Sequence, residues 1–433
     1  MKLVFFTPAK EASAIGSCCS LVTKELIAQG HEVVVVRTET ERLLKDRTHN
    51  FGTPVLSWTQ ADAITKAAKD ADAVIYQIGN SFDFHKGALF WLEKLSGIVI
   101  LHDFFLGHLF WSWAQADLVK AKSVLEAWYG EKVAGTYFTN PGSTNFIDRT
   151  IDTAPMTEWV CSMATAVITH SSWGCDRVLK SCAGPVRVIP LTPPKELNSY
   201  LSASTFKPTK ASRFTITTFG HINQNKRAES IIKAIGNSPL LRENSVYQLA
   251  GSIQPNTVLE LSNLARSHGV DIVIHGEVSD QILTRAIQRS DVITCLRWPS
   301  LEAASASLIE ALLSGRSTIV TDTGFYADIP SSCVLKVRPT NELEDIQSAL
   351  ELLFTDRERR QAIGEEGQRW ASTTFTVENY AKELANAVNQ AAIAKPTLDA
   401  VRSFYGNMAR WEADDKLLNT DEILKPLQMF GTA

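Results

Sequence analysis

Short apolar strands that follow a helix, across a boundary made of aspartate or small residues, recur along this chain. Residues 69–76 and 289–294 both show the pattern, as Lys-Asp-Ala-Asp-Ala-Val-Ile-Tyr and Arg-Ser-Asp-Val-Ile-Thr. The start of the chain adds a strand pattern at 2–6, an amphipathic helix at 21–29 and a run of valines at 33–36. A continuous apolar run of this kind is typical of a parallel strand covered on both faces. The repetition predicts α/β domains with doubly wound parallel sheets.

The length of the chain and one proline-rich segment indicate two such domains. At about 150 residues per domain, a chain of 433 residues exceeds one ordinary core. Residues 190–212 contain several prolines among Ser, Thr and Lys, and a strand pattern resumes at 214–219. We expect a Rossmann-like N-terminal domain at 1–193 and a Rossmann-like C-terminal domain at 194–375. A helical tail at 376–433 is expected to return to the first domain.

The charge balance and the cysteine content exclude several classes of protein. The chain has 43 Lys and Arg against 47 Asp and Glu, a net charge of −4, so no basic field exists to attract nucleic acid. No apolar run approaches the ~18 residues of a membrane span, and the first residues lack the apolar region of a secretory signal. The seven cysteines include no Cys-x-x-Cys pair, which disfavours a zinc site and a disulfide framework. We expect a cytoplasmic protein without a metal site.

The candidate ligand-binding residues follow predicted strands, because ligands collect beyond the carboxyl ends of the strands in open parallel sheets. The most informative segment places Glu302 and Glu310 eight positions apart, with a helix predicted to begin near Ser305. The N–H groups at that start, including those of Ala304, Ser305 and Ala306, are surrounded by small side chains and suit a phosphate. Carboxylates accept hydrogen bonds from hydroxyl groups, so Glu302 would suit a polyol and Glu310 a ribose.

With its spacing of Glu, seven residues and Glu, the chain resembles the retaining, GT-B-fold glycosyltransferases of family four. The glycine and basic residues in 219–227 are similar to those after the first strand of that family's second domain. Residues 275–278, 321–325 and 30–33 are similar to further family positions. The resemblance extends from residue 1 to about residue 390. It implies a GT-B fold, in which two Rossmann-like domains face a cleft.

The resemblance also implies an activity. A sugar would pass from a nucleotide-sugar donor, UDP- or GDP-linked, to a hydroxyl of a glycan, lipid-linked or protein-linked acceptor, with the anomeric configuration kept. Such a reaction would belong to bacterial polysaccharide or glycoconjugate synthesis. No metal is required, because a lysine and a helix N-terminus can stabilise the charge that develops on the leaving diphosphate.

The roles of single residues are carried over from the family. Glu310 would bind the ribose, and Glu302 the hydroxyls of the donor sugar. Lys226 would bind the pyrophosphate, His102 would contact the donor sugar from the first domain, and residues 276–278 would line the base. The remaining candidates for contact with the donor are Gly16, Gly220, Arg227, Glu277, Val278, Arg297, Ala304, Ser305 and Ala306.

Two segments depart from the family pattern. Ala303-Ala304-Ser305 stands where Gly-Phe-Gly is usual, which keeps the N–H groups of the helix start accessible. His221 stands where an arginine is common, and Arg227 is a candidate to compensate for it.

Each assignment also has a plainer interpretation. Glu302 and Glu310 could lie on a solvated loop and helix face, Lys226 on a surface turn, and His102 in the core. The aromatic run at 104–113 is too short to span a bilayer and is expected in the core; the alternative is a surface for an acceptor or for peripheral membrane contact.

Two other classes of function remain open. One is a GT-B enzyme that hydrolyses or epimerises a nucleotide sugar. The other is a non-catalytic partner subunit, against which the intact carboxylate pair argues.

Overall fold

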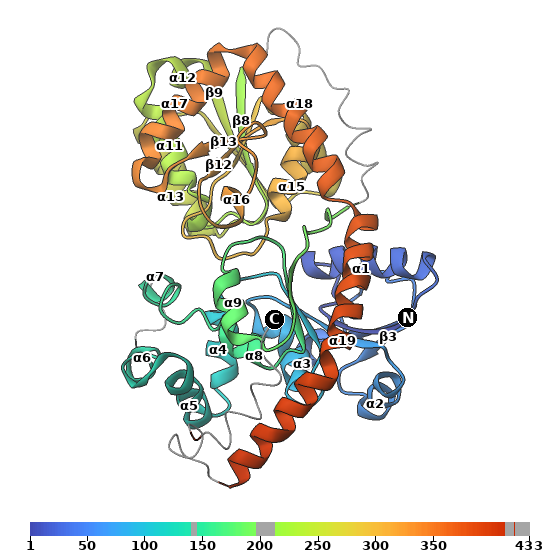
Figure 1. The fold of residues 1–433 in the computed structure, drawn as a ribbon. Helices are drawn as coiled ribbons and strands as arrows, with labels where there is room; N and C mark the ends of the chain where they lie inside the picture. Colours follow the sequence, from blue (N-terminus) through green and yellow to red (C-terminus); the bar gives the residue numbers. More distant parts are fainter. Residues whose placement is uncertain (140–144, 196–212, 412–419, 421–433) are drawn as a thin grey trace.

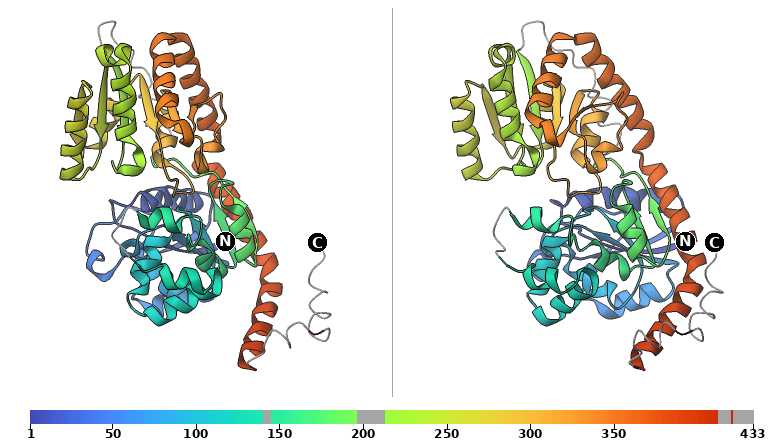
Figure 2. Two further views of the ribbon diagram at one scale, coloured as in Figure 1. Left: turned by 90° about the vertical axis from the view of Figure 1, so that its left-hand side faces the viewer. Right: turned by 60° about the vertical axis from the view of Figure 1, so that its left-hand side comes forward.

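The computed structural model of the chain describes residues 1–139, 145–195, 213–411 and 420. Two α/β domains lie one above the other, and the long C-terminal helix Val377–Arg410 runs down along the first of them (Figure 1). Figure 2 shows the same helix leaving the second domain and passing down the side of the first.

The elements of the first domain are β1 (Lys2–Thr7), α1 (Ala14–Ala28), β2 (Glu32–Arg37), β3 (Val55–Ser57), α2 (Ala61–Lys69), β4 (Ala73–Ile78), α3 (Phe82–Leu92), β5 (Ile98–Leu101), α4 (Gly107–Ala114), α5 (Leu118–Tyr129), α6 (Glu131–Thr136), α7 (Asn145–Thr150), α8 (Thr157–Ser162), β6 (Ala166–Thr169), α9 (Cys175–Ser181) and β7 (Val186–Val188). Those that follow are β8 (Phe214–Phe219), α11 (Ala228–Asn237), α12 (Pro239–Asn244), β9 (Ser245–Ala250), α13 (Pro255–Ser267), β10 (Ile272–Gly276), α14 (Asp280–Arg289), β11 (Val292–Cys295), α15 (Ala306–Leu313), β12 (Ser317–Thr321), α16 (Gly324–Ala327), β13 (Leu335–Val337), α17 (Glu342–Thr355), α18 (Arg357–Thr374) and α19 (Val377–Arg410). Short 3₁₀ turns lie at Glu41–Leu43, Gln224–Lys226 and Pro339–Asn341.

Both sheets are parallel along every strand pair that the structure describes. The first has the order β3-β2-β1-β4-β5-β6-β7 and the second the order β10-β9-β8-β11-β12-β13. The direction of winding reverses between β1 and β4 and between β8 and β11, which are the positions where ligands bind in such sheets. The prediction of two doubly wound parallel-sheet domains is confirmed.

The first sheet is covered on both faces, as its continuous apolar strands predict. Leu3 and Phe5 of β1 belong to a buried cluster with residues of α1 and α19. Val4 and Phe6 belong to a second cluster that includes residues of α3 and α4. Successive side chains of a strand point to opposite faces, so both sets are buried only where helices cover both faces.

Helix α19 packs against the first domain. Tyr380, Leu384 and Val388 are buried in the same cluster as Leu3 and Phe5. The helix therefore lies against the first domain, and Arg402 still donates to the Ala164 carbonyl at 3.1 Å. Residues 412–419 and 421–433 of the expected tail lie outside the described residues.

Two helices are longer than the sequence pattern indicates. Helix α1 begins at Ala14 rather than at residue 21, because the Ser13 hydroxyl accepts a hydrogen bond from the Gly16 N–H and caps the helix there. Helix α19 continues to Arg410, beyond the helix pattern that the sequence shows at 377–394, and contains Pro396.

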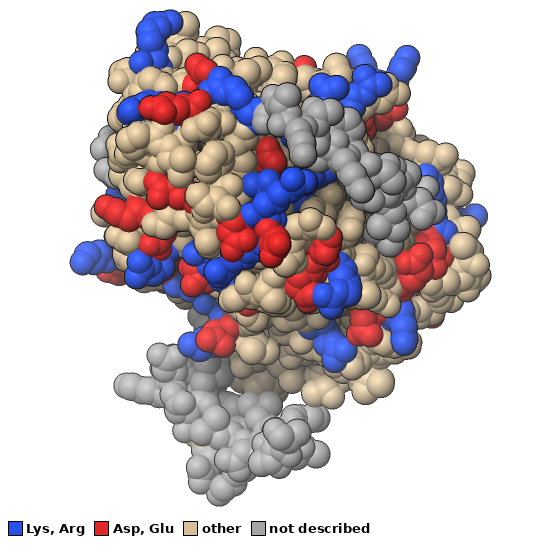
Figure 3. Space-filling view, turned by 90° about the horizontal axis from the view of Figure 1, so that it is seen from above, with Lys and Arg blue, Asp and Glu red and all other residues tan. Residues whose placement is uncertain are grey.

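The surface carries no large field of one sign on the face seen in Figure 3, where Lys and Arg side chains alternate with Asp and Glu. Among the described helices, none combines the length and the apolarity that crossing a membrane requires.

Candidate active site

The two domains meet through their strand-end loops. The loop after β11 pairs with the loop after β5: the Phe104 N–H donates to the Leu301 carbonyl at 2.8 Å, and the Ala303 N–H donates to the His102 carbonyl at 2.9 Å. Asp103 and Glu302 are partners in this antiparallel bridge. The carboxyl edges of the two sheets therefore face each other, and residues of both lie at the contact.

Helix α15 begins at this contact. Its cap is Ser305, whose hydroxyl accepts a hydrogen bond from the Leu308 N–H at 3.3 Å, as the sequence predicts. Leu308 and Ile309 are buried, as expected of the apolar stripe. Ala303 and Ala304 precede the cap, so the two residues before it carry only methyl side chains.

Lys226 lies beside that helix start. A methyl group placed on Gly220 would be 3.1 Å from the Lys226 Nζ and 3.1 Å from the Ser307 Oγ, so these three residues converge. Gly220 has φ +88°, a conformation that favours glycine. The Lys226 ammonium donates to the Phe219 carbonyl and is buried. Burial, with repulsion from Arg297, lowers the pKa of Lys226 to about 7. An anion at this position would restore the charge.

Glu302 is held from two sides. Its Oε1 atom accepts a hydrogen bond from Arg297 Nε at 3.1 Å and another from the Tyr326 hydroxyl. Arg297 is buried, and its other nitrogen donates to the Leu296 carbonyl at 2.8 Å. Glu302 is therefore a fixed carboxylate and not a solvated loop residue.

Glu310 is a buried residue of α15 and is only 7% exposed. Burial raises the pKa of its carboxyl, and Lys195 opposes that shift. The Lys195 Nζ lies 3.4 Å from Glu310 Oε1 and 3.5 Å from Asp280 Oδ1. The interpretation of Glu310 as a solvated face is wrong.

Among known proteins, residues 203–370 match the family model described as glycosyl transferases group 1. The matched residues cover most of the second domain. A search of curated proteins gave no match. The solved structures that resemble most of the chain include three with TM-scores of 0.54 to 0.64. Sucrose-phosphate synthase from Thermosynechococcus elongatus has a TM-score of 0.64 at 14% identity, over 91% of this chain and 100% of that one.

The second structure is HepE of Anabaena in complex with UDP and glucose, with a TM-score of 0.60 at 14% identity, over 90% of this chain and 99% of that one. The third is WaaG, a glycosyltransferase involved in lipopolysaccharide biosynthesis, with a TM-score of 0.54 at 14% identity, over 89% and 99% of the two chains. Together with the two parallel sheets, these matches show that the chain has the GT-B fold.

The side chain of Arg227 does not lie with the other candidate donor residues. Arg227 is directed to helix α17, where its Nε and Nη2 atoms donate to the two carboxylate oxygens of Glu342 at 2.8 and 2.7 Å. Ser230 donates to the same carboxylate. The guanidinium is thus engaged in packing α11 against α17, and the geometry gives no support to the idea that it compensates for His221.

Gly16 and the segment at 276–278 lie on other loops than Lys226. The backbone of Gly276 is nevertheless connected to the Gly220 loop, because its carbonyl accepts from the Gly251 N–H at 2.8 Å and Gly251 packs directly on the Gly220 backbone. Gly16 is required by packing, because a methyl group on it would be 2.5 Å from the Pro8 carbonyl oxygen. Glu277 is exposed and Val278 half-buried after the edge strand β10, two strands from β8.

His102 is half-buried, and its side chain faces the sheet of the first domain. Its Nε2 atom pairs with Gln77 Oε1, and its ring lies 5.0 Å from that of His170. Burial, with repulsion from His170, holds the pKa of His102 well below its ordinary value, so the ring is neutral at pH 7. Its backbone carbonyl, in contrast, takes part in the contact between the domains.

The sequence led to no assigned role for three residues of the site. Asp103 directly follows His102 and shares its strand-end signal. Tyr326 lies in a four-residue helix, α16, after β12. Lys195 lies in the connection between the domains. No sequence pattern marks it as a site residue, because the polar segment around it shows no periodicity.

Proposed function

We propose that the protein is a retaining, metal-independent glycosyltransferase that moves a sugar from a UDP- or GDP-linked donor to an acceptor hydroxyl. The observation that carries the proposal is the position of Lys226. A buried ammonium with a lowered pKa stands beside the N-terminus of α15. The same segment carries two carboxylates, Glu302 before the helix and the buried Glu310 within it. This arrangement suits a diphosphate that is bonded to two hydroxyl-bearing groups.

The donor would lie along this row of residues. Its diphosphate would accept hydrogen bonds from the Lys226 ammonium and from the first N–H groups of α15. Glu310 would accept hydrogen bonds from the ribose hydroxyls, and Glu302 from those of the donor sugar. The resemblance to structures such as that of HepE with UDP supports a nucleotide ligand.

The reaction follows from these positions. The acceptor oxygen forms a bond to the anomeric carbon of the donor sugar, and the bond from that carbon to the diphosphate oxygen breaks. The electron pair of the broken bond stays on the diphosphate, which also takes the proton of the acceptor hydroxyl. Lys226 and the helix start stabilise the charge that grows on the leaving group, which is why no metal ion is needed.

The proposal extends to the cellular context as well. Glycan, lipid-linked and protein-linked acceptors all present the hydroxyl that the reaction requires, and synthesis of a bacterial polysaccharide or glycoconjugate is the process we infer. A cytoplasmic protein, with peripheral contact to the membrane for a lipid-linked acceptor, fits the pattern of the sequence.

A thermal-shift panel of UDP, GDP, ADP and their sugar conjugates tests the proposal. A ligand present at 100 times its Kd stabilises the folded state by about 2.7 kcal/mol, which a melting curve resolves. We expect one nucleotide series to raise Tm, and Glu310→Ala to abolish that rise while the protein remains folded.

Product analysis then separates the possible activities. Transfer with retained configuration appears as a new glycoside only when an acceptor is added. Release or epimerisation of the sugar without an acceptor would identify a hydrolase or epimerase, and a Tm unchanged by every nucleotide would identify a non-catalytic subunit.

A further inference from the structure

Strand β10 forms one edge of the second sheet, and its residues are only partly covered. Among the described strands it pairs with β9 alone, at the end of the order β10-β9-β8-β11-β12-β13. None of the residues Ile272–Gly276 is buried, whereas every residue of β11 and β12 is. An open edge presents N–H and C=O groups to which a further strand can bind.

Exposed apolar side chains lie at this edge and on the two helices next to it. Val273 of β10 is 40% exposed, Leu259 of α13 is 64% exposed and Ile282 of α14 is 48% exposed. Native proteins usually protect an open edge with charged side chains or proline. The centre of β10 is instead Ile-Val-Ile at 272–274. This combination indicates an edge that another chain covers.

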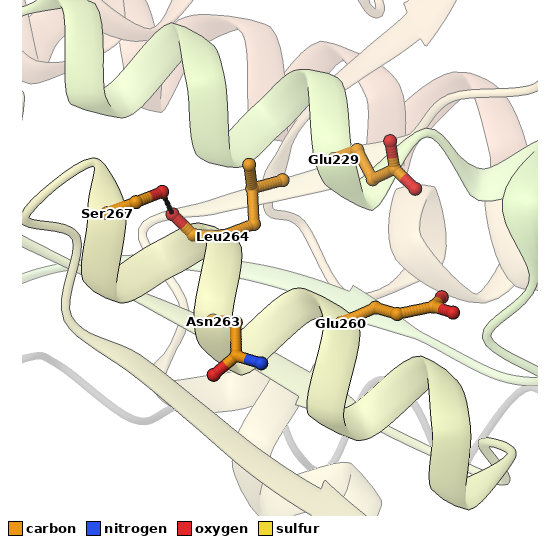
Figure 4. Close-up of a pocket in the computed structure, with 5 residues that line it drawn as sticks. All are labelled: Glu229, Glu260, Asn263, Leu264 and Ser267. Carbon is orange, nitrogen blue, oxygen red and sulfur yellow. Dashed lines mark hydrogen bonds between the residues drawn. The ribbon is translucent and has the colours of Figure 1, made fainter.

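Helix α13 turns one side toward the same edge. The side that faces α11 lines a pocket of about 410 Å³ with Glu260, Asn263, Leu264 and Ser267 (Figure 4). Leu261 and Ala265 are buried against the sheet. At about 100° per residue, Leu259 and Ser262 belong to the third side of the helix, away from α11. Helix α11 packs against both α13 and α17, so α13 is the outer helix and this third side faces beyond β10.

The backbone of β10 turns two residues toward the open edge. The Asp271 carbonyl accepts a hydrogen bond from the Tyr247 N–H of β9 at 2.9 Å. In a parallel ladder, alternate residues of a strand bond to the same neighbour, so Asp271 and Val273 turn their N–H and C=O groups to β9. Those of Ile272 and Ile274 therefore point to the open edge.

Antiparallel pairing with a second copy of β10 satisfies these backbone groups. With a twofold axis at Val273, Ile272 of one copy lies opposite Ile274 of the other. Each such pair exchanges both of its N–H···O=C bonds, and the axis generates the pair twice. The edge is thus complementary to itself.

The charges beside Val273 select this register. Asp271, Val273 and His275 are exposed on one face of the strand, and with the axis at Val273 each Asp271 lies opposite His275 of the second copy. An imidazole N–H donates to a carboxylate in either protonation state of the ring. An axis at Ile272 or at Ile274 would instead place Asp271 or His275 opposite a valine.

We propose that the protein forms a twofold dimer through β10. The two six-stranded sheets continue into one, and the α13 helices meet on the side that carries Leu259. A β-bulge between Ile274 and Gly276 ends the regular pairing, so the interface is short. We expect a Kd of roughly 10 µM, at the weak end for specific interfaces. The dimer does not depend on the proposed function.

Sedimentation velocity of the full chain, from about 1 to 200 µM, tests the dimer. Val273→Lys places two ammonium groups against each other at the axis, and the exposed position is compatible with folding. The matched control is Val188→Lys, because Val188 is an exposed valine on β7, an edge strand of the first sheet.

We expect the original protein and Val188→Lys to dimerise with the same Kd, and Val273→Lys to raise it at least about tenfold. A melting curve of each variant confirms that it is folded. A monomeric original protein, a dimer that Val273→Lys leaves unchanged, or an equal loss in Val188→Lys would overturn the proposal.

A charge exchange tests the register. His275→Asp brings two carboxylates opposite each other on both sides of the axis, and we expect the Kd to rise about tenfold. Adding Asp271→His to the same chain restores opposite partners and should return the Kd to within about threefold of its original value. A dimer that is insensitive to His275→Asp, or that the second substitution does not restore, would refute the pairing of these residues.

A cross-link provides a measurement that does not depend on affinity. In Val273→Cys the two thiols face each other at a pair without hydrogen bonds, where the Cα atoms are ~4.5 Å apart, within the range of a disulfide. Oxidised glutathione should convert this variant to a covalent dimer on a non-reducing gel. Val188→Cys and the original protein, whose cysteines are buried or half-buried, should stay monomeric on the gel. Failure of Val273→Cys to cross-link would contradict the dimer.

Discussion

The Nζ atom of Lys195, in the connection between the two domains, lies 3.4 Å from Oε1 of the buried Glu310. This contact brings a cation to the carboxylate that we assign to the ribose. It opposes the effect of burial, which raises the pKa of Glu310. The connection between the domains therefore helps to keep the ribose-binding group ionised.

A first prediction follows for Lys195→Met. Without the ammonium, the pKa of Glu310 rises further, and a protonated carboxyl accepts hydrogen bonds from ribose less well. Nucleotide binding is lost as the pH falls through this pKa, so in the variant the loss begins at a higher pH. Calorimetric titration of UDP between pH 5 and 8 measures the shift, with the exposed Lys382→Met on α19 as control. Identical pH profiles for the two variants would contradict the prediction.

Lys226→Met is expected to separate activity from stability. Loss of the ammonium removes the charge that stabilises the leaving diphosphate, and we expect kcat to fall by ~10²–10³. The pKa of this lysine is about 7 in the folded protein, against 10.5 for an ordinary lysine, so at pH 7 to 10 the unfolded chain binds the proton more strongly. Burying this group thus costs stability, most of all below pH 7.

The variant should consequently melt about 2–4 °C higher at pH 7, and the difference should shrink as the pH approaches 10. Scanning calorimetry at several pH values, beside the transfer assay, provides both readouts. A lower Tm together with the lost activity would show that Lys226 mainly supports the fold.

Arg227→Gln is expected to lower stability and to leave activity unchanged, the reverse of Lys226→Met. The bidentate pair with Glu342 is half-buried, and its loss leaves a carboxylate that is only 11% exposed. We expect a decrease of about 1–2 kcal/mol in the free energy of unfolding, with kcat unchanged. Urea denaturation measures the first quantity. Arg338→Gln is the matched control, because Arg338 pairs with both carboxylate oxygens of Asp345 on the exposed surface, where the loss of stability should be smaller.

Arg227 and Ser305 also show what the sequence can and cannot predict. The Ser305 cap is local, because its hydroxyl and the Leu308 N–H are three residues apart, and the apolar stripe that follows identifies the helix. Arg227 was expected to contact the donor because it directly follows Lys226. Its true partner, Glu342, is 115 residues away, and its backbone has φ 57°, which turns the side chain from the strand end.

Like the Ser305 cap, the doubly wound sheets could be predicted because local sequence patterns indicate them. The apolar strands and the residues that end them are short patterns, and their repetition implies the topology. The contact between Asp103 and Glu302 could not be predicted from the sequence, because it depends on how two separate domains meet. The same is true of Lys195 and Glu310, which lie 115 residues apart.

The last prediction concerns Tyr326, whose hydroxyl donates to the same oxygen of Glu302 as Arg297 does. In Tyr326→Phe, Arg297 remains as a donor to that oxygen, but the carboxylate gains freedom to turn away from the sugar hydroxyls. A hydrogen bond to a charged group contributes about 1.5–3 kcal/mol, so we expect kcat/KM for the nucleotide sugar to fall about 10- to 100-fold. UDP alone has no sugar to contact Glu302, and its Kd should not change. Tyr247→Phe removes an equally buried hydroxyl, which pairs with Thr218 inside the second sheet, and thus controls for the loss of a buried hydrogen bond. Equal effects of the two variants on kcat/KM, or a weaker affinity for UDP in Tyr326→Phe, would show that Tyr326 does not act through Glu302.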